Sequence, residues 1–281
     1  GGAYSAYQRL ESLLEAHPAQ ARAMSLPAPS GSWQFQGVFA APPGIRTPTV
    51  RNISLAVEPG EVLALIGPSG SGKTTLARAG LGVWPVLGGS VRIDGAEVDQ
   101  YNPDELGPSV GYLPQDIELF NGSVAENIAR FSEPDPEAVV RAAQLAGADT
   151  MIRHLPDGYD SLVGSAGGVL SAGQRQRVGL ARAVYGEPRL IVLDEPNSNL
   201  DDEGEQALVE AIASLRAAGA ATVVITHKRN ILGQVDKIAL LRAGQLAAYG
   251  ARDEVLARLS AGNDPAAQQR VAASTASASQ K

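Results

Sequence analysis

The chain has 281 residues, enough to bury a full hydrophobic core, and its 23 lysines and arginines against 30 aspartates and glutamates give a net charge of −7. This acidic balance, without a clustered basic patch, argues against a nucleic-acid partner, because phosphate backbones are bound by clustered cations. The lack of cysteine excludes disulfides and thiolate metal sites. No apolar run approaches the roughly 18 residues that a membrane span needs.

The first 31 residues predict a helix followed by a linker. Prolines and a glycine interrupt residues 17–31, so this stretch is predicted to be the linker. Because the chain begins with Gly1 rather than methionine, we expect it to be a processed or excised piece of a longer protein. Within residues 4–15, apolar side chains recur at the spacing of an amphipathic helix: Tyr7, Leu10, Leu13 and Leu14.

The sequence then predicts strands up to residue 113. Apolar residues alternate with polar ones in two stretches, and a continuous apolar run over 61–66 predicts a buried parallel strand. Asp94-Gly95 predicts a tight hairpin turn. The predicted strands cover residues 33–37, 53–57, 61–66, 90–93 and 110–113.

Residues 120–170 are predicted to be mostly helical. Ser123 and Glu126 form a capping box at the start of a short helix. A glycine-rich loop over 155–168 precedes Ser171, which is placed to cap a helix over 174–185. A further helix over 136–146 carries apolar side chains on one side, namely Val139, Val140, Ala143 and Leu145.

The last third of the chain returns to strands. Buried strands are predicted over 189–195 and 221–226, and a hairpin over 237–249 turns at Ala243-Gly244. A last helix over 253–259 precedes a tail that we expect to be disordered. Strands that alternate with helices predict an α/β domain with a mainly parallel sheet, into which the helical stretch is inserted.

Between the strand at 61–66 and the helix that follows lies the phosphate-binding pattern G-x-x-x-x-G-K-[ST]. Its glycines let backbone N–H groups close around phosphate oxygens, and the helix N-terminus adds the positive end of its dipole. Lys73 is expected to reach the β- and γ-phosphates of a nucleoside triphosphate, and the Thr74 hydroxyl to ligate Mg²⁺. The alternative, a glycine-rich turn with a solvated lysine, does not explain the flanking strand and helix. The residues assigned to the nucleotide are Gly67, Ser69, Gly70, Ser71, Gly72, Lys73, Thr74 and Thr75.

Two predicted strands end in residues that suit hydrolysis. Asp194-Glu195 and Thr226-His227 follow buried strands, and the carboxyl ends of parallel strands meet at the edge of the sheet where ligands bind. Asp194 is expected to hold the water shell of Mg²⁺, and Glu195 to polarise an attacking water. His227 is expected to contact the γ-phosphate. A helix cap or a solvated turn is the alternative for the two acids, and a structural role is the alternative for the histidine.

Taken together, these residues resemble the nucleotide-binding domain of an ATP-binding cassette (ABC) transporter over about residues 33–260. Six motifs follow one another in the family's order: the Walker A loop, the Q-loop at Gln115, the signature at 170–174, the Walker B strand, the D-loop at 198–201 and the switch His227. The resemblance implies a P-loop NTPase of the α/β class, with a mainly parallel sheet core, an antiparallel N-terminal β subdomain and an inserted helical subdomain at about 116–186. The domain is expected to cover residues 32–260, with a helix and linker at 1–31 and the tail at 261–281.

The same resemblance implies that two copies of the domain bind two ATP molecules head to tail. Ser171, Gly173 and Gln174 of one copy would face the γ-phosphate held by Lys73 of the other, with Asp201 in the same contact region. Gln115 would sense Mg²⁺ and pass its state to a transmembrane domain. The predicted metal site therefore comprises Thr74, Gln115 and Asp194, and the catalytic group Glu195, His227, Lys73 and Gln115.

Finer features resemble the type I protein-secretion exporters of Gram-negative bacteria. They lie in residues 82–85, 112–128 and 196–201. This likeness implies a secreted protein as cargo, a membrane domain fused upstream, a periplasmic adaptor and an outer-membrane channel. The helix at 4–15 would then leave the last membrane helix, with the domain at the cytoplasmic face of the bacterial inner membrane.

Three positions depart from the family's pattern. Ala172 replaces the second glycine of the signature, and we expect its methyl group to crowd the loop. Residues 161–167 lack the charges that exporters usually carry there, which puts normal coupling in doubt. Pro42 stands where an adenine-stacking tyrosine is expected, and the nearest aromatic residue, Phe39, is predicted by strand alternation to face the core.

Two other functions remain possible for this sequence. A cassette ATPase without a transporter, such as a chromosome-organising or translation factor, would need long coiled coils or basic surfaces, and neither is present. A regulatory module that binds ATP without turnover would not need Glu195 and His227. The signature departures nevertheless leave this second possibility open.

Overall fold

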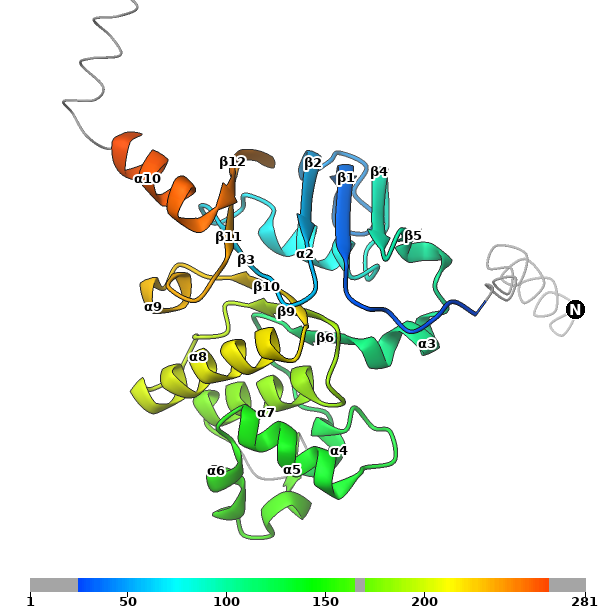
Figure 1. The fold of residues 1–281 in the computed structure, drawn as a ribbon. Coiled ribbons are helices and arrows are strands. Elements are labelled where there is room, and N and C mark those ends of the chain that lie inside the picture. Colours follow the sequence, from blue (N-terminus) through cyan, green and yellow to red (C-terminus); the bar gives the residue numbers. More distant parts are fainter. Residues whose placement is uncertain (1–24, 165–169, 263–281) are drawn as a thin grey trace, which may run out of the picture.

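The computed structural model describes residues 25–164 and 170–262, which Figure 1 shows as a ribbon. The predicted helix at 4–15, residues 165–169 of the loop before the signature and the tail beyond 262 lie outside the described residues. Within the described residues, none of the helices is long and apolar enough to cross a bilayer.

In the described part of the chain, a six-stranded, mainly parallel sheet runs through the middle of the molecule (Figure 1). Every residue of its strands β9 and β10 is buried, because packed layers cover both faces of the sheet. One edge strand, β12, pairs antiparallel with β11 through the predicted turn at Ala243-Gly244, where both residues have positive φ. The order across the sheet is β12 (Gln245–Ala251), β11 (Lys237–Arg242), β3 (Val62–Ile66), β10 (Ala221–Ile225), β9 (Leu190–Asp194) and β6 (Val110–Leu113).

An antiparallel sheet from the N-terminal part of the chain packs beside this one. The predicted Asp94-Gly95 turn joins its last two strands, with φ of 50° and 86°. Helix α2 (Lys73–Gly80) lies against β1, where the Trp33 indole Nε1 donates to the Gly80 carbonyl at 3.0 Å. The strand order is β2 (Val50–Val57), β1 (Trp33–Ala40), β4 (Val86–Ile93) and β5 (Ala96–Glu97).

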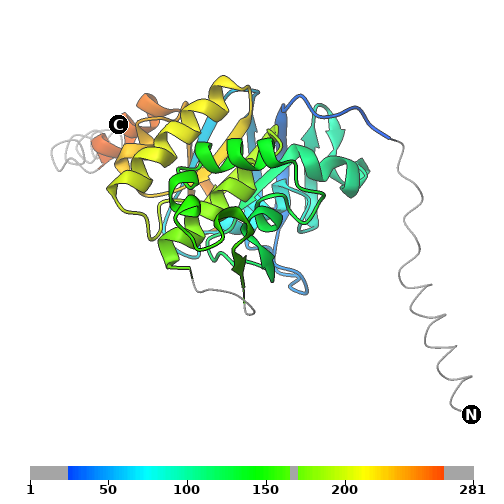
Figure 2. The same cartoon turned by 90° about the horizontal axis from the view of Figure 1, so that it is seen from below.

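Helices form a layer on the other side of the central sheet (Figures 1 and 2). Ser123, Asp135 and Ser171 cap three of them, and the first and last form capping boxes with Glu126 and Gln174. The layer contains α4 (Val124–Ile128), α5 (Pro136–Leu145), α6 (Asp149–Arg153), α7 (Ala172–Val184) and α8 (Asp202–Ala217), with the short strands β7 (Gly122–Ser123) and β8 (Leu162–Val163).

The remaining elements are short or peripheral. Three 3-10 turns cover Val98–Gln100, Gly107–Ser109 and Gly158–Asp160, and the α-helices are α3 (Pro103–Leu106), α9 (Arg229–Leu232) and α10 (Arg252–Gly262). The core accordingly has two parts on the two faces of the central sheet, one among the helices and one between α2 and the antiparallel sheet.

The sequence prediction was wrong or incomplete in several places. Helix α5 buries Val139, Ala142 and Ala143, whereas Val140 and Leu145 are only half-buried. Helix α2 begins at Lys73, within the phosphate-binding pattern rather than after it. The long helix α8 was not predicted, although its buried residues Leu208, Ala211, Ile212 and Leu215 recur at helical spacing. The β7–β8 pair was not predicted, because each of its strands has only two residues.

Strand β1 shows why simple alternation fails for Phe39. The strand register shifts between Phe35 and Val38, so one extra residue is accommodated at this point. Val38 and Ala40 consequently face the core, and Phe39 is half-buried beside Gly88 on the other face. The prediction that Phe39 faces the core is therefore wrong.

One arginine ties the helical layer to the central sheet. The guanidinium of Arg130, just after α4, donates to five backbone carbonyls, so a single cation satisfies acceptors from two chain segments, 107–110 and 182–185. Burial lowers the pKa of Arg130. The acceptors are the carbonyls of Gly107, Val110, Arg182, Ala183 and Tyr185.

We expect Arg130→Ala to lower the free energy of unfolding by about 2–4 kcal/mol, because several carbonyls lose a charged donor in a place that water reaches poorly. Urea denaturation measures this loss. Arg153→Ala is the matched control. Arg153 is 59% exposed and pairs with Asp149 four residues away on the same helix, so the loss there should stay below about 0.5 kcal/mol. Equal losses in the two variants would contradict the role given to Arg130.

Candidate nucleotide-binding site

A pocket of about 250 Å³ lies at the carboxyl ends of β3, β9 and β10, where the sequence places the phosphate loop and the acidic pair. It brings together most of the residues predicted for the nucleotide and the metal. Thr49 and Ile225 also line it, although neither was predicted. The lining comprises Thr49, Ser69, Gly70, Gly72, Lys73, Thr74, Thr75, Gln115, Asp194, Glu195, Ile225 and His227.

The phosphate loop is held in shape by glycines that no other residue could replace. Gly72 is the N-cap of α2 with φ of 97°, and a Cβ there would lie 2.4 Å from Val50 Cγ1. A Cβ on Gly67 would lie 2.1 Å from the Leu241 carbonyl oxygen, so the loop can pass this strand only as glycine. The loop thus brings backbone N–H groups to the start of a helix, which is an anion-binding arrangement.

Lys73 and Thr74 extend from the first turn of α2. The Lys73 ammonium, on a residue 8% exposed, donates to the carbonyls of Gly67 and Pro68 at 2.8 and 3.0 Å. The Thr74 hydroxyl donates to Asp194 Oδ2 at 2.8 Å. The loop and the end of β9 are therefore joined through the two side chains predicted to serve the metal.

Asp194 is nearly enclosed, with 1% of its surface exposed. Burial raises the pKa of this carboxyl and Glu195 raises it further, whereas the Thr74 hydroxyl, Arg78 and Lys73 act in the opposite direction. A buried carboxylate of this kind favours a cation beside it. The Thr74 and Asp194 oxygens fit Mg²⁺, which binds one or two protein oxygens and takes its other ligands from water and phosphate.

Glu195 and His227 face each other across the pocket. His227 Nε2 lies 3.4 Å from Glu195 Oε1, and their side chains are 56% and 21% exposed. Glu195 has φ of 49°, a left-handed conformation that is uncommon for glutamate and belongs to the strained conformations that cluster at functional sites. Its backbone N–H donates to the Ile225 carbonyl at 2.9 Å, which fixes the acid beside β10.

The structure places the other predicted residues apart from this pocket. Gly67 and Ser71 belong to the loop but do not line the cavity, and Ser71 is buried.

The signature residues lie at the start of α7. Ser171 and Gln174 form the capping box of this helix, and a Cβ on Gly173 would lie 2.7 Å from the Asn199 carbonyl oxygen. Asp201 caps α8 and pairs with Arg177 of α7. The signature and D-loop residues therefore cluster together, away from Lys73 of the same chain.

The structure also locates the three positions that depart from the family's pattern. Ala172 is exposed at the start of α7. Residues 165–169 of the preceding loop lie outside the described residues, so the crowding expected of the Ala172 methyl group stays a prediction. Pro42 is half-buried in the β1–β2 connection and does not line the pocket. The part of the loop at 161–164 that the structure describes includes β8, while residues 165–167 lie outside the described residues.

Comparison with known proteins gives the chain a family. The family model for the ABC transporter matches residues 50–198. The type I secretion system ATP-binding protein PrsD of Rhizobium meliloti is 48% identical over 258 residues, which cover 92% of this chain and 44% of that protein. The ATP-dependent lipid A-core flippase of Burkholderia orbicola is 38% identical over 226 residues, covering 80% of this chain and 38% of the flippase.

A solved structure is also similar. A bacterial Atm1-family ABC exporter with ATP bound superimposes with a TM-score of 0.75 at 29% identity, over 89% of this chain and 44% of that one. The chain belongs to the ABC transporter family, as an ATP-binding domain of the ATPase type with the P-loop α/β fold. It spans less than half the length of these relatives.

The absence of an aromatic residue at position 42 predicts weak recognition of the base. Stacking on an aromatic ring is worth roughly 1–3 kcal/mol by analogy with single-strand binders, or about 5- to 150-fold in affinity. We therefore expect the chain to bind ATP weakly and to prefer it over GTP only slightly, because the phosphate loop contacts the triphosphate alone.

Nucleotide titrations of Pro42→Tyr and Phe39→Ala, each checked for folding, measure this effect. Tyrosine at position 42 should tighten ATP binding several-fold, and Phe39→Ala should leave it unchanged. If the tyrosine has no effect and a folded Phe39→Ala loses ATP, the base stacks on Phe39 instead. Phe39 is able to stack on the base in that case, because its ring does not face the core.

Proposed function

We propose that this chain is the motor domain of a type I secretion exporter, which hydrolyses ATP to move a protein across the bacterial inner membrane. The observation that supports ATP hydrolysis is that five residues suited to it line one pocket. They are Lys73, Thr74, Asp194, Glu195 and His227. The 48% identity with a type I secretion system ATP-binding protein supports a protein as the cargo.

In this proposal each side chain has one task. Lys73 neutralises charge on the β- and γ-phosphates, and Glu195 orients the attacking water and accepts its proton. His227, in contact with Glu195, holds the γ-phosphate and keeps the acid in place. Mg²⁺, held by Thr74 and Asp194 with Gln115 close by, would neutralise the charge that develops on the phosphates.

The proposed active site is completed by a second copy of the chain. Ser171 is exposed at the N-terminus of the 13-residue helix α7, and neither Ser171, Gly173 nor Gln174 lines the pocket of its own chain. A hydroxyl, a backbone N–H and a helix N-terminus form an anion site that suits the γ-phosphate of a partner. Asp201, beside α7, would lie in the same contact region.

The remaining partners follow from the same proposal. Residues 1–31 would join the domain at 32–260 to a transmembrane domain, with the helical subdomain at about 116–186 and the tail at 261–281. A periplasmic adaptor and an outer-membrane channel would complete the exporter, and the chain would work at the cytoplasmic face of the inner membrane.

A lipid is the second candidate for the cargo, because one relative is named as a lipid A-core flippase.

We expect Glu195→Gln to keep ATP binding, to lose hydrolysis and to accumulate an ATP-dependent dimer, because the amide retains the shape of the acid but cannot accept the proton. Steady-state ATPase rates and sizing chromatography with and without ATP measure both effects. If Glu195→Gln hydrolyses ATP at the wild-type rate, Glu195 does not act in the mechanism. A wild-type chain that binds ATP without hydrolysing it would instead favour a regulatory module.

A mixing experiment tests whether the site is shared between two chains. Lys73→Ala and Ser171→Arg should each be inactive alone, since one removes the phosphate cation and the other blocks the partner's γ-phosphate. Mixed together they should regain part of the activity, because each heterodimer keeps one intact composite site. An inactive mixture in which heterodimers demonstrably form would show that Ser171 does not act across the dimer.

A further inference from the structure

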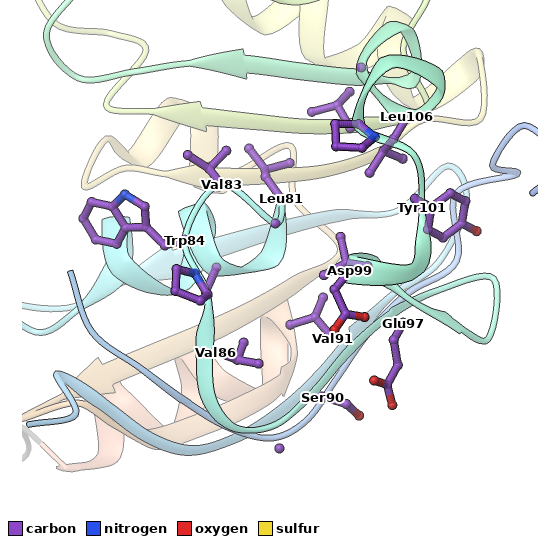
Figure 3. Close-up of a pocket in the computed structure, with 18 residues that line it drawn as sticks. Leu81, Val83, Trp84, Val86, Ser90, Val91, Glu97, Asp99, Tyr101 and Leu106 are labelled. Carbon is purple, nitrogen blue, oxygen red and sulfur yellow. The ribbon is translucent and has the colours of Figure 1, made fainter. Parts of the chain in front are cut away.

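A second and larger cavity lies between the end of α2 and the antiparallel sheet, away from the nucleotide pocket. Its volume is about 550 Å³, and its lining comes mainly from residues 79–91 and 97–110. Val83 on its wall is 58% exposed. Figure 3 shows Trp84 at one end of this groove and Glu97 and Tyr101 at the other.

Arg78 of α2 contacts both the side chain and the backbone of Trp84. The Arg78 guanidinium carbon lies 4.8 Å from the centroid of the indole, a cation–π contact. The Arg78 carbonyl also accepts hydrogen bonds from the backbone N–H groups of Val83 and Trp84, at 3.0 and 3.3 Å. Both the side chain and the backbone of Arg78 therefore set the position of this wall.

The same guanidinium also contacts the strand that leads to the nucleotide pocket. Arg78 Nε donates to the Tyr112 hydroxyl at 3.0 Å. Tyr112 lies on β6, three residues before Gln115, which lines the nucleotide pocket. Arg78 follows Lys73 by five residues on the same helix, and its charge is among those that oppose the rise in the pKa of Asp194.

We propose that Arg78 is a positioning residue that couples the nucleotide pocket to Trp84 at the groove, through Tyr112 and helix α2. This inference rests on the proposed function, since it assumes that ATP occupies the pocket around Lys73. Binding of ATP draws charge and hydrogen bonds of Lys73, Asp194 and Gln115 toward the phosphates. Arg78 is joined to Lys73 through helix α2, to Gln115 through Tyr112 of β6, and to Asp194 by electrostatic attraction. A change at these residues therefore shifts the Arg78 guanidinium relative to the Trp84 indole.

Intrinsic fluorescence tests this coupling, because the chain contains only two tryptophans and Trp33 is fully buried. Subtracting the spectrum of Trp84→Phe isolates the signal of Trp84. In the wild-type chain, ATP with Mg²⁺ should change that signal. In Arg78→Gln, most of the change should disappear while calorimetry still shows ATP binding. The kcat for ATP hydrolysis should fall several-fold with little change in KM.

Two further variants separate coupling from general effects. Tyr112→Phe removes only the hydroxyl that accepts from Arg78, and it should lose part of the response. Arg92→Gln is the matched control, because Arg92 bonds Glu97 at the far end of the same groove, with a contact of 2.7 Å, and it should keep the full response.

The outcomes are distinguishable. A wild-type chain that does not bind ATP contradicts the proposed function itself. If the wild type binds ATP but the Trp84 signal does not change, the coupling is wrong. A full response in Arg78→Gln, or an equal loss in Arg92→Gln, overturns the role of Arg78 as well.

Discussion

The site depends on the hydrogen bond from the Thr74 hydroxyl to the Asp194 carboxylate, which joins residues 120 positions apart in the chain. Asp194 is buried at the end of a fully buried strand, and a carboxylate in such a place needs donors or cations around it. Thr74 supplies the donor, and Lys73 and Arg78 supply positive charge. The phosphate loop and the acidic pair are thereby held in one relative position before any nucleotide binds.

The residues around this contact differ in their exposure to solvent. Asp194 and Lys73 are buried, Glu195 is half-buried, and His227 is exposed. Rigid burial suits groups that bind phosphate and metal, because a fixed charge costs little reorganisation when the transition state forms. An exposed histidine beside a half-buried acid is instead suited to a site that closes against another surface. This division supports the proposal that a second chain covers the pocket.

Arginines connect the layers of the molecule. Arg130 binds carbonyls at the start of β6 and at the end of α7, so the helical layer cannot shift without breaking several charged hydrogen bonds. Arg177 of α7 pairs with Asp201 at the start of α8, within the same layer. Each guanidinium offers several donors in a fixed plane, which lets one side chain join more than one segment. Such contacts fix the signature helix α7 relative to α4, α8 and strand β6.

The sequence alone determined the motifs, the buried strands and the helix caps, because each depends on local spacing. The Gly67–Thr75 loop, the Asp94-Gly95 turn, the capping box at Ser123 and the N-cap at Ser171 were all predicted. Only the tertiary structure decided the face of Phe39, since a register shift in β1 inverts the alternation. It likewise brought Thr49 into the pocket and exposed Ala172. The contacts of Arg78 and Arg130 join residues distant in the chain, and no local pattern records which carbonyl or ring a long side chain will reach.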